Sequence, residues 1–174
     1  MCIRDRDVTV SGSQKGLMMP PGLGFNTLSE RAIEVAKKGG SKRSYWDWQD
    51  MLNANATGYF PYTPATTLFY GLREAIAMLE EEGLDNVFSR HQRLADSCRA
   101  AVRAWELETV CLNPREHSNA LTGIMMPDGH DADYLRDVIL EHFDMSLGTG
   151  LGKIKGKAFR IGHLGAVSYT HLRA

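Results

Sequence analysis

The sequence has no excess of charge of either sign. Its 174 residues carry 20 Lys and Arg against 21 Asp and Glu, which gives a formal net charge of −1 at pH 7. Nucleic acids and anionic membrane surfaces are bound largely through an excess of positive charge. We therefore expect neither a nucleic-acid partner nor a membrane partner held by bulk charge.

Clustered cysteines and long apolar runs are also absent. Cys2, Cys98 and Cys111 are far apart, and no CxxC pair or Cys/His spacing accompanies them. No apolar run approaches the ~20 residues that cross a bilayer, and the opening MCIRDR lacks the apolar segment of a signal peptide. These absences predict no disulfide framework and no metal site, and they favour a reducing, cytoplasmic location.

The two ends of the sequence are atypical of domain ends. The opening MCIRDR (1–6) and the closing VSYTHLRA (167–174) resemble translated adapter sequence, so we interpret them as a non-native leader and tail. Frayed native termini are the alternative. A strand pattern begins directly at Asp7-Val8-Thr9-Val10, so we expect an internal fragment of a longer protein.

The first half predicts a buried strand at 7–10, a loop of small residues that carries Lys15, and helices. Thr27-Leu28-Ser29-Glu30 has the pattern of a capping box before a helix that ends at Lys38-Gly39. The aromatic-rich range 41–62 is expected to be irregular. Thr63-Pro64 predicts the start of a longer helix that ends before Gly83.

The second half predicts a helix that leads into a small sheet. The helix opens at Leu84, and its expected apolar stripe consists of Val87, His91, Leu94, Cys98, Ala101 and Trp105. Strands are expected at 107–111, 121–126 and 159–164, with an amphipathic helix at 131–143. A set of strand, loop and helices gives way near Gly83 to a helix that leads into a small sheet, which predicts one domain over 7–83 and an α+β domain over 84–166.

Two cationic residues are candidates for chemistry. Lys15 lies between a strand and a loop where a lysine can lose solvation, which lowers its pKa and suits a Schiff-base nucleophile. Arg160 lies within an otherwise apolar strand and needs an anion, either a substrate carboxylate or a structural ion-pair partner. The alternative for Lys15 is an ordinary solvated lysine.

Other motifs do not meet the requirements of their chemistry. Gly148–Lys153 is glycine-rich, but Ile154 replaces the Ser or Thr of a phosphate-binding loop. Ser13 lacks the flanks of a GxSxG nucleophile elbow. The histidines at 117, 130 and 142 have no shared spacing as metal ligands.

Several ordered motifs together resemble the class V pyridoxal-phosphate aminotransferases, most closely their serine-glyoxylate and alanine-glyoxylate branch. The first is SGSQKG at 11–16 with PPG at 20–22. The others are YFPYTP at 59–64, YGLRE at 70–74, GLDN at 83–86, GLGK at 150–153 and FRIGHLG at 159–165. The resemblance covers nearly everything from Asp7 to Gly165.

The resemblance implies an α/β fold, the fold type I of aspartate aminotransferase-like enzymes. The chain would contain the end of the large domain and an α+β small domain. Lys15 would hold pyridoxal phosphate covalently and act as general acid and base, and Gln14 would contact the cofactor phosphate. Thr63, with Tyr62 as a weaker candidate, would reach the phosphate in a homodimeric partner, and Arg160 would bind the substrate carboxylate.

The implied reaction moves an amino group from serine or alanine to glyoxylate by a ping-pong mechanism. Its substrates are small amino acids and 2-oxo acids. Other class V enzymes remain open, with a different amino donor or a cysteine desulfurase-like lyase chemistry, as does a noncatalytic interaction domain. The family's other cofactor contacts lie upstream of the lysine, where this chain has only 14 residues, so the fragment alone is expected to be inactive.

Overall fold

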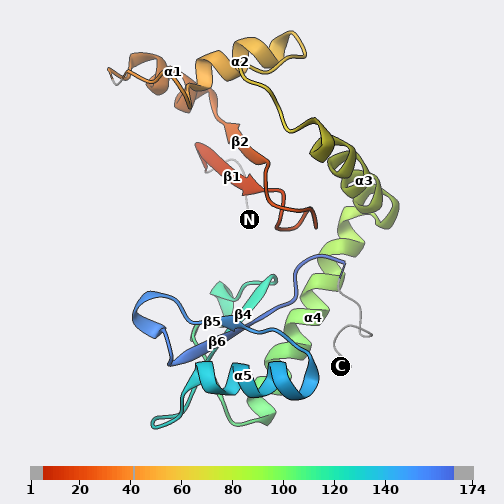
Figure 1. The fold of residues 1–174 in the computed structure, drawn as a ribbon, viewed down its shortest axis with the longest axis vertical. Coiled ribbons are helices and arrows are strands. Elements are labelled where there is room, and N and C mark those ends of the chain that lie inside the picture. Colours follow the sequence, from red (N-terminus) through yellow and green to blue (C-terminus); the bar gives the residue numbers. More distant parts are fainter. Residues whose placement is uncertain (1–5, 41, 167–174) are drawn as a thin grey trace. The chain divides into compact units, whose positions relative to one another are not determined.

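The structure is a computed structural model that describes residues 6–40 and 42–166 (Figure 1). It divides into two compact units between Ala77 and Met78. The domain boundary expected near Gly83 stays a prediction. The leader and tail expected at 1–6 and 167–174 lie outside the described residues, apart from Arg6.

The first unit begins with an antiparallel hairpin of β1 (Val8–Gly12) and β2 (Gly24–Leu28). The strand expected at 7–10 is confirmed, but its expected burial is wrong, because Val10 is 70% exposed. In the described part of the chain this sheet has two strands, so no further strand covers β1. β2 was not predicted, since Gly24 and Asn26 are residue types that strands disfavour.

Helix α1 (Glu30–Lys38) follows β2 directly, and its N-cap is Ser29 instead of the expected Thr27. Ser29 Oγ accepts a hydrogen bond from the Ala32 N–H at 3.1 Å and donates one to the Asp7 carboxylate at 2.8 Å. Thr27 cannot serve as the cap because it still pairs with Thr9 in the hairpin. The helix ends at Lys38, as predicted.

Two further helices belong wholly or partly to this unit. Helix α2 (Trp48–Ala56) lies in the range expected to be irregular, and the Asp47 side chain caps it by accepting from the Gln49 N–H. Helix α3 (Thr66–Glu82) begins three residues after Thr63, where its start was expected. Ala65 is the residue that directly precedes the helix, so Thr63 does not serve as its N-cap.

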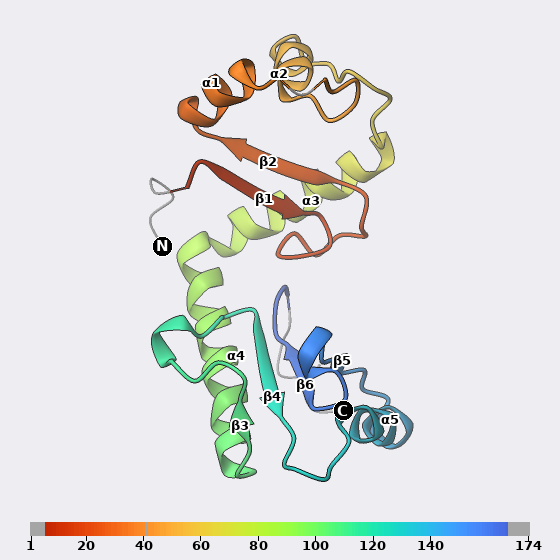
Figure 2. The same cartoon turned by 90° about the vertical axis from the view of Figure 1, so that its left-hand side faces the viewer.

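The second unit contains a four-stranded antiparallel sheet in the order β3-β4-β6-β5. Its strands are β3 (Glu108–Thr109), β4 (Leu121–Met125), β5 (Gly148–Thr149) and β6 (Ala158–Gly162). Helix α4 (Leu84–Ala104) packs against β3 and β4, and α5 (Ala132–Phe143) packs against β5 and β6 (Figure 2). The predicted strands and helices of this half are thus present, with β3 shorter than expected.

One face of this sheet forms the core of the unit. Ile124 on β4 lies opposite Phe159 on β6, and both pack with Val102 of α4 and Ala132 of α5. The stripe expected on α4 is correct at Val87 and Leu94 but wrong at Trp105, which is 56% exposed. The helix ends at Ala104, so Trp105 lies beyond the surface that the core covers. None of the helices described here is long and apolar enough to cross a membrane.

Candidate active site

The loop that carries Lys15 is fixed by the side chain of Ser13, which is fully buried. Ser13 Oγ donates a hydrogen bond to the Pro20 carbonyl at 2.7 Å and accepts one from the Leu23 N–H at 3.2 Å. The backbone N–H of Ser13 also donates to the Leu23 carbonyl at 3.0 Å. Both ends of the loop are therefore joined across the hairpin, and the two residues after Ser13 are held at its tip.

The backbone of Lys15 is hydrogen-bonded within this turn, whereas its side-chain amine has no partner among the residues that the structure describes. Its N–H donates to the Gly12 carbonyl at 3.2 Å, and its carbonyl accepts from the Met18 N–H at 2.9 Å. Within residues 6–40 and 42–166 no hydrogen bond or ion pair engages the Lys15 amine. The residue is exposed in the part of the chain that the structure describes, so the expected loss of solvation is wrong there.

Gln14 is also exposed, and its side chain lies over the backbone of Gly12. A Cβ atom at Gly12 would lie only 2.7 Å from Gln14 Oε1. A larger residue at position 12 would therefore displace the Gln14 amide. The absence of a side chain at Gly12 thus leaves room for the Gln14 amide over the backbone of the loop.

Helix α3 supports the far side of the lysine loop. Met19 is buried, and its Cε atom lies 3.4 Å from where a Cβ atom of Gly71 would be. Gly22, with φ of +146°, would place a Cβ atom 2.5 Å from Leu68 Cδ1. The Gly22 backbone thus approaches Leu68 of α3 closely, which explains the glycine of the PPG motif, while Met19 lies at ordinary contact distance from Gly71.

Tyr62 and Thr63 lie in the segment before α3 and differ in their contacts. The Tyr62 hydroxyl donates to the Ser44 carbonyl at 2.7 Å, and its ring lies 4.5 Å from that of Tyr45. Both residues line a shallow hollow together with Tyr59, Phe60 and Phe69. The contact with Ser44 gives Tyr62 a structural role in this unit, whereas no hydrogen bond in the described ranges engages the Thr63 hydroxyl.

Arg160 belongs to the second unit and lies on the face of the sheet opposite the core. Its neighbour Phe159 points into the core, so the alternation of a strand turns Arg160 the other way. Its partners on the adjacent strands are both glycines, Gly123 on β4 and Gly148 on β5. The half-buried Arg160 side chain lies over the Gly148 backbone, whereas the Val110 side chain lies over Gly123.

The guanidinium of Arg160 has one bonded nitrogen. Its Nε–H donates to the Thr149 carbonyl at 2.8 Å. Across the described residues, no carboxylate forms an ion pair with it, and the structural ion pair considered from the sequence is not present there. Its two terminal nitrogens remain available to an external anion.

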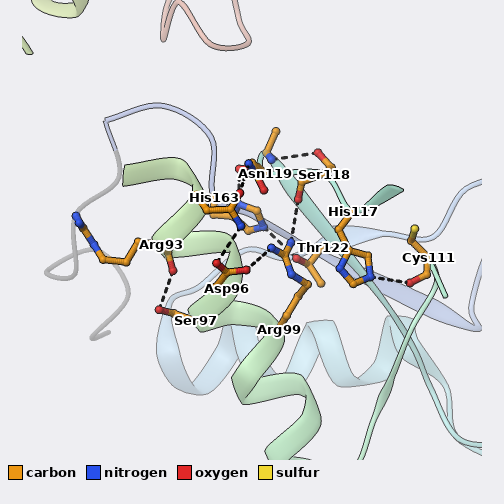
Figure 3. A network of polar contacts seen from close by, with 12 residues as sticks. Arg93, Asp96, Ser97, Arg99, Cys111, His117, Ser118, Asn119, Thr122 and His163 are labelled. Atoms are coloured by element: carbon orange, nitrogen blue, oxygen red, sulfur yellow. Dashed lines mark hydrogen bonds and ion pairs between the residues drawn. The ribbon is translucent and has the colours of Figure 1, made fainter. Parts of the chain in front are cut away.

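The end of β6 is held by a buried polar network that sequence reasoning missed (Figure 3). His163 is 1% exposed, and its two ring nitrogens lie 3.0 Å from the Asn119 carbonyl and 3.0 Å from Thr122 Oγ1. Because a carbonyl oxygen only accepts, Nδ1 carries the proton and the Thr122 hydroxyl donates to Nε2. Burial, followed by the nearby Arg99 and His91 charges, lowers the pKa of His163, although its bond to Asn119 acts in the opposite direction.

The buried side chain of Arg99 completes this network on α4. Its guanidinium donates to Asp96 at 2.7 Å and to the Ser118 carbonyl at 3.1 Å. Hydrogen bonds from Gln92 and then Arg99 lower the pKa of Asp96. These contacts join α4 to the loop before β4, and only the burial of a cation on an otherwise apolar helix face could have indicated them from the sequence.

Comparison with known proteins shows which family the chain belongs to. Residues 4–151 match the profile of the aminotransferase class-V family. This chain belongs to the aminotransferase class-V family. It is 45% identical over 171 residues to the serine–glyoxylate aminotransferase of Methylorubrum extorquens, covering 95% of this chain and 42% of that protein.

Two further similarities support the class V assignment. The chain is 43% identical to the L-aspartate–glyoxylate aminotransferase of Paracoccus denitrificans over 93% of this chain and 41% of that protein. The crystal structure of an alanine–glyoxylate aminotransferase from Nostoc sp. aligns with a TM-score of 0.81 and 30% identity, over 92% of this chain and 43% of that one. The fold is therefore that of the type I pyridoxal-phosphate enzymes. The chain spans about 42% of the length of the Methylorubrum extorquens protein.

Class V aminotransferases use pyridoxal phosphate, and the lysine loop fits this cofactor. A free, exposed amine on a rigidly held turn can bond to an aldehyde, and the Gln14 amide next to it can donate to a phosphate. Lys15, Gln14, Tyr62 and Thr63 belong to the first unit and Arg160 to the second. A group of three or more residues able to hold a metal ion does not occur in the described part of the chain.

Proposed function

We propose that the complete protein containing this chain transfers the amino group of serine, or of alanine, to glyoxylate. The products are glycine and hydroxypyruvate, or pyruvate, formed by a ping-pong mechanism. The free amine of Lys15 on its locked turn is the observation that carries this proposal. The names of the similar proteins support glyoxylate as the acceptor and leave serine, alanine and aspartate as donors.

Lys15 and Arg160 would have the central roles. Pyridoxal phosphate, when bound, supplies an electron sink for the pair of electrons released at the substrate α-carbon. Lys15 Nζ would remove the proton from the α-carbon of the amino acid and return one to the α-carbon of the oxo acid. Arg160 would bind the carboxylate that both substrates share, which sets the orientation of the α-carbon.

The remaining proposed contacts are to the cofactor phosphate. Gln14 would donate to it from beside Lys15. Thr63, whose hydroxyl is free in the described chain, would reach the phosphate bound in the second subunit of a homodimer, and Tyr62 would assist from the same segment. A cytoplasmic location stays a prediction.

A cysteine desulfurase-like activity is less well supported. Such a lyase needs a reactive thiolate on a mobile loop. Of the cysteines that the structure describes, Cys98 is on helix α4, where burial is the main cause that raises its pKa and favours the unreactive thiol. Cys111 follows β3, and its thiol donates to the Asn113 carbonyl at 3.5 Å.

The visible absorbance spectrum of the complete protein with pyridoxal phosphate tests the role of Lys15. We expect a band that shifts when L-serine is added and that is lost in Lys15→Ala. Lys38→Ala is the matched control, because Lys38 is an exposed lysine at the end of α1, and it should leave the band unchanged. A band of equal strength in Lys15→Ala would contradict the proposed role of Lys15. If the band shifts with L-aspartate but not with L-serine, aspartate replaces serine as the proposed amino donor.

A further inference from the structure

The position of the Arg160 guanidinium depends on a strand of only two residues. β5 consists of Gly148 and Thr149 at the edge of the sheet, and Thr149 provides the carbonyl that accepts from Arg160 Nε at 2.8 Å. A two-residue edge strand has few ladder hydrogen bonds of its own. Side-chain contacts therefore add to its few backbone hydrogen bonds, such as that from the Gly150 N–H to the Ala158 carbonyl at 2.9 Å, in fixing its position.

The Thr149 side chain supplies such a contact on the core side of the sheet. Thr149 lies opposite Phe159, whose side chain is in the core, so the Thr149 side chain points toward the helices. Its hydroxyl donates to Asp133 Oδ1 in the first turn of α5 at 2.9 Å. The same residue therefore bonds α5 through its side chain and Arg160 through its carbonyl.

Asp133 is itself held in place by Arg136, one turn further along α5. Arg136 Nη1 donates to Asp133 Oδ1 at 2.8 Å, and Arg136 Nε donates to the Leu147 carbonyl, next to β5, at 2.8 Å. Hydrogen bonds from Thr149 and then Arg136 lower the pKa of Asp133, so the carboxylate is charged at neutral pH. A charged acceptor makes the bond from Thr149 stronger than a neutral one would.

Gly148 completes the arrangement on the open side of the sheet. A Cβ atom there would lie 3.2 Å from both Cβ and Nε of Arg160. The guanidinium therefore packs against the Gly148 backbone, and any displacement of β5 displaces its support as well as its hydrogen-bond acceptor.

We propose that Thr149 and Asp133 are positioning residues for Arg160, which fix its Nε through the Thr149 carbonyl and leave Nη1 and Nη2 to receive the substrate carboxylate. This inference rests on the proposed function, since it assigns the means by which the carboxylate-binding arginine is oriented. Neither positioning residue contacts substrate. Their effect reaches the site only through β5.

Steady-state kinetics of the complete enzyme provide the first test. Thr149→Val removes the hydroxyl and keeps the shape of the side chain. We expect KM for both serine and glyoxylate to rise about threefold to tenfold, which corresponds to the net free energy of one hydrogen bond. The kcat value should stay unchanged, because the carboxylate is bound equally in the ground and transition states. Thr149→Ser keeps the hydroxyl and should restore KM.

Thr109→Val is the matched control. Thr109 is on β3 of the same sheet, and its hydroxyl donates to the Cys111 carbonyl at 2.8 Å, without any link to Arg160. It should leave both KM values unchanged. An unchanged KM in Thr149→Val, in an enzyme whose KM rises in Arg160→Lys, would overturn the inference, as would an equal rise in Thr109→Val.

A second readout does not depend on activity. In protein labelled with ¹⁵N-arginine, the NMR signal of Arg160 Nε, assigned from its loss in Arg160→Lys, should move in Thr149→Val and in Asp133→Asn but not in Thr109→Val. If the complete protein shows no Lys15-dependent absorbance, the proposed function fails, and this signal still decides whether Thr149 positions Arg160. A signal that stays in place in Thr149→Val rejects the inference in either case.

Discussion

At the scale of single residues, the small side chain of Ser13 holds the backbone of the lysine loop in place. Its hydroxyl is fully buried and satisfies two backbone groups, the Pro20 carbonyl and the Leu23 N–H. A buried polar group that loses its partner has no water to replace it. The order of the turn that carries Gln14 and Lys15 is therefore tied to this one hydroxyl.

Replacing Ser13 by alanine should lower the free energy of unfolding by about 1–3 kcal/mol, because both backbone groups lose their partner. Denaturant unfolding of the complete protein, with and without pyridoxal phosphate, measures this change. Ser11→Ala, at an exposed position on β1, is the control and should cost less than about 0.5 kcal/mol. Equal costs in the two variants would show that the hydroxyl of Ser13 does not hold the loop.

The same scale shows how far residue chemistry can be predicted from the sequence. The location of Lys15 in a loop after a strand is confirmed, and Arg160 does lie in a strand. The role of Thr149 could not be predicted. Its contacts join positions 133, 149 and 160, and only the antiparallel register of β5 and β6 brings those positions together.

At the scale of elements, the sequence predicts the long helices better than the short strands. Helices α4 and α5 begin where Gly83 and Asp131 indicate, since capping and apolar spacing are local signals. β2 and α2 were not predicted. Their residues carry no clear alternation or apolar stripe, and the pairing of β2 with β1 is a contact between segments that composition does not reveal.

The buried end of β6 should make stability depend on pH. Burial lowers the pKa of His163 below its ordinary value of 6.5, so the unfolded chain takes up a proton at a higher pH than the folded protein does. The part of the free energy of unfolding that depends on neutral His163 is therefore fully present above pH 6.5. It is lost as the pH falls from 6.5 toward the lowered pKa of His163 in the folded protein. Protonation of Nε2 would also place a second donor against the Thr122 hydroxyl, which would have to rotate.

Urea unfolding midpoints between about pH 7.5 and about pH 5 measure this dependence. In His163→Gln the loss of stability over this interval should be smaller than in the unchanged protein, because the titrating group is gone. His142→Gln, at an exposed histidine in the last turn of α5, is the control and should retain the full loss. The same pH dependence in all three proteins would exclude His163 as its source.

At the scale of the whole molecule, the exposed apolar side chains are conspicuous. Trp46, Tyr59 and Tyr70 in the first unit are 76%, 73% and 77% exposed, and Phe88 in the second is 62% exposed. Large contiguous apolar patches are uncommon on soluble monomers and often mark surfaces that another part of a protein covers. The chain spans about 42% of the length of the similar Methylorubrum extorquens protein. A complete protein of that length would have further residues that can cover these exposed aromatic side chains.

The chain by itself should therefore bind the apolar dye ANS more strongly than the complete protein does. ANS fluorescence at equal molar concentration, with light scattering to follow self-association, measures the difference. A doubly substituted chain, Tyr59→Ser with Tyr70→Ser, should bind less dye than the unchanged chain. Equal fluorescence of the chain and the complete protein would mean that the exposed aromatic residues stay in water in both.

The short length of β5 would affect the release of product in the proposed enzyme. An edge strand of two residues separates from its neighbour at a lower free energy than the central strands β4 and β6 do. When β5 separates, Arg160 stays on β6 but loses its Nε acceptor and its glycine support together. In the proposed enzyme, local opening of this edge would therefore weaken the binding of a carboxylate by Arg160, through residues of the second unit alone.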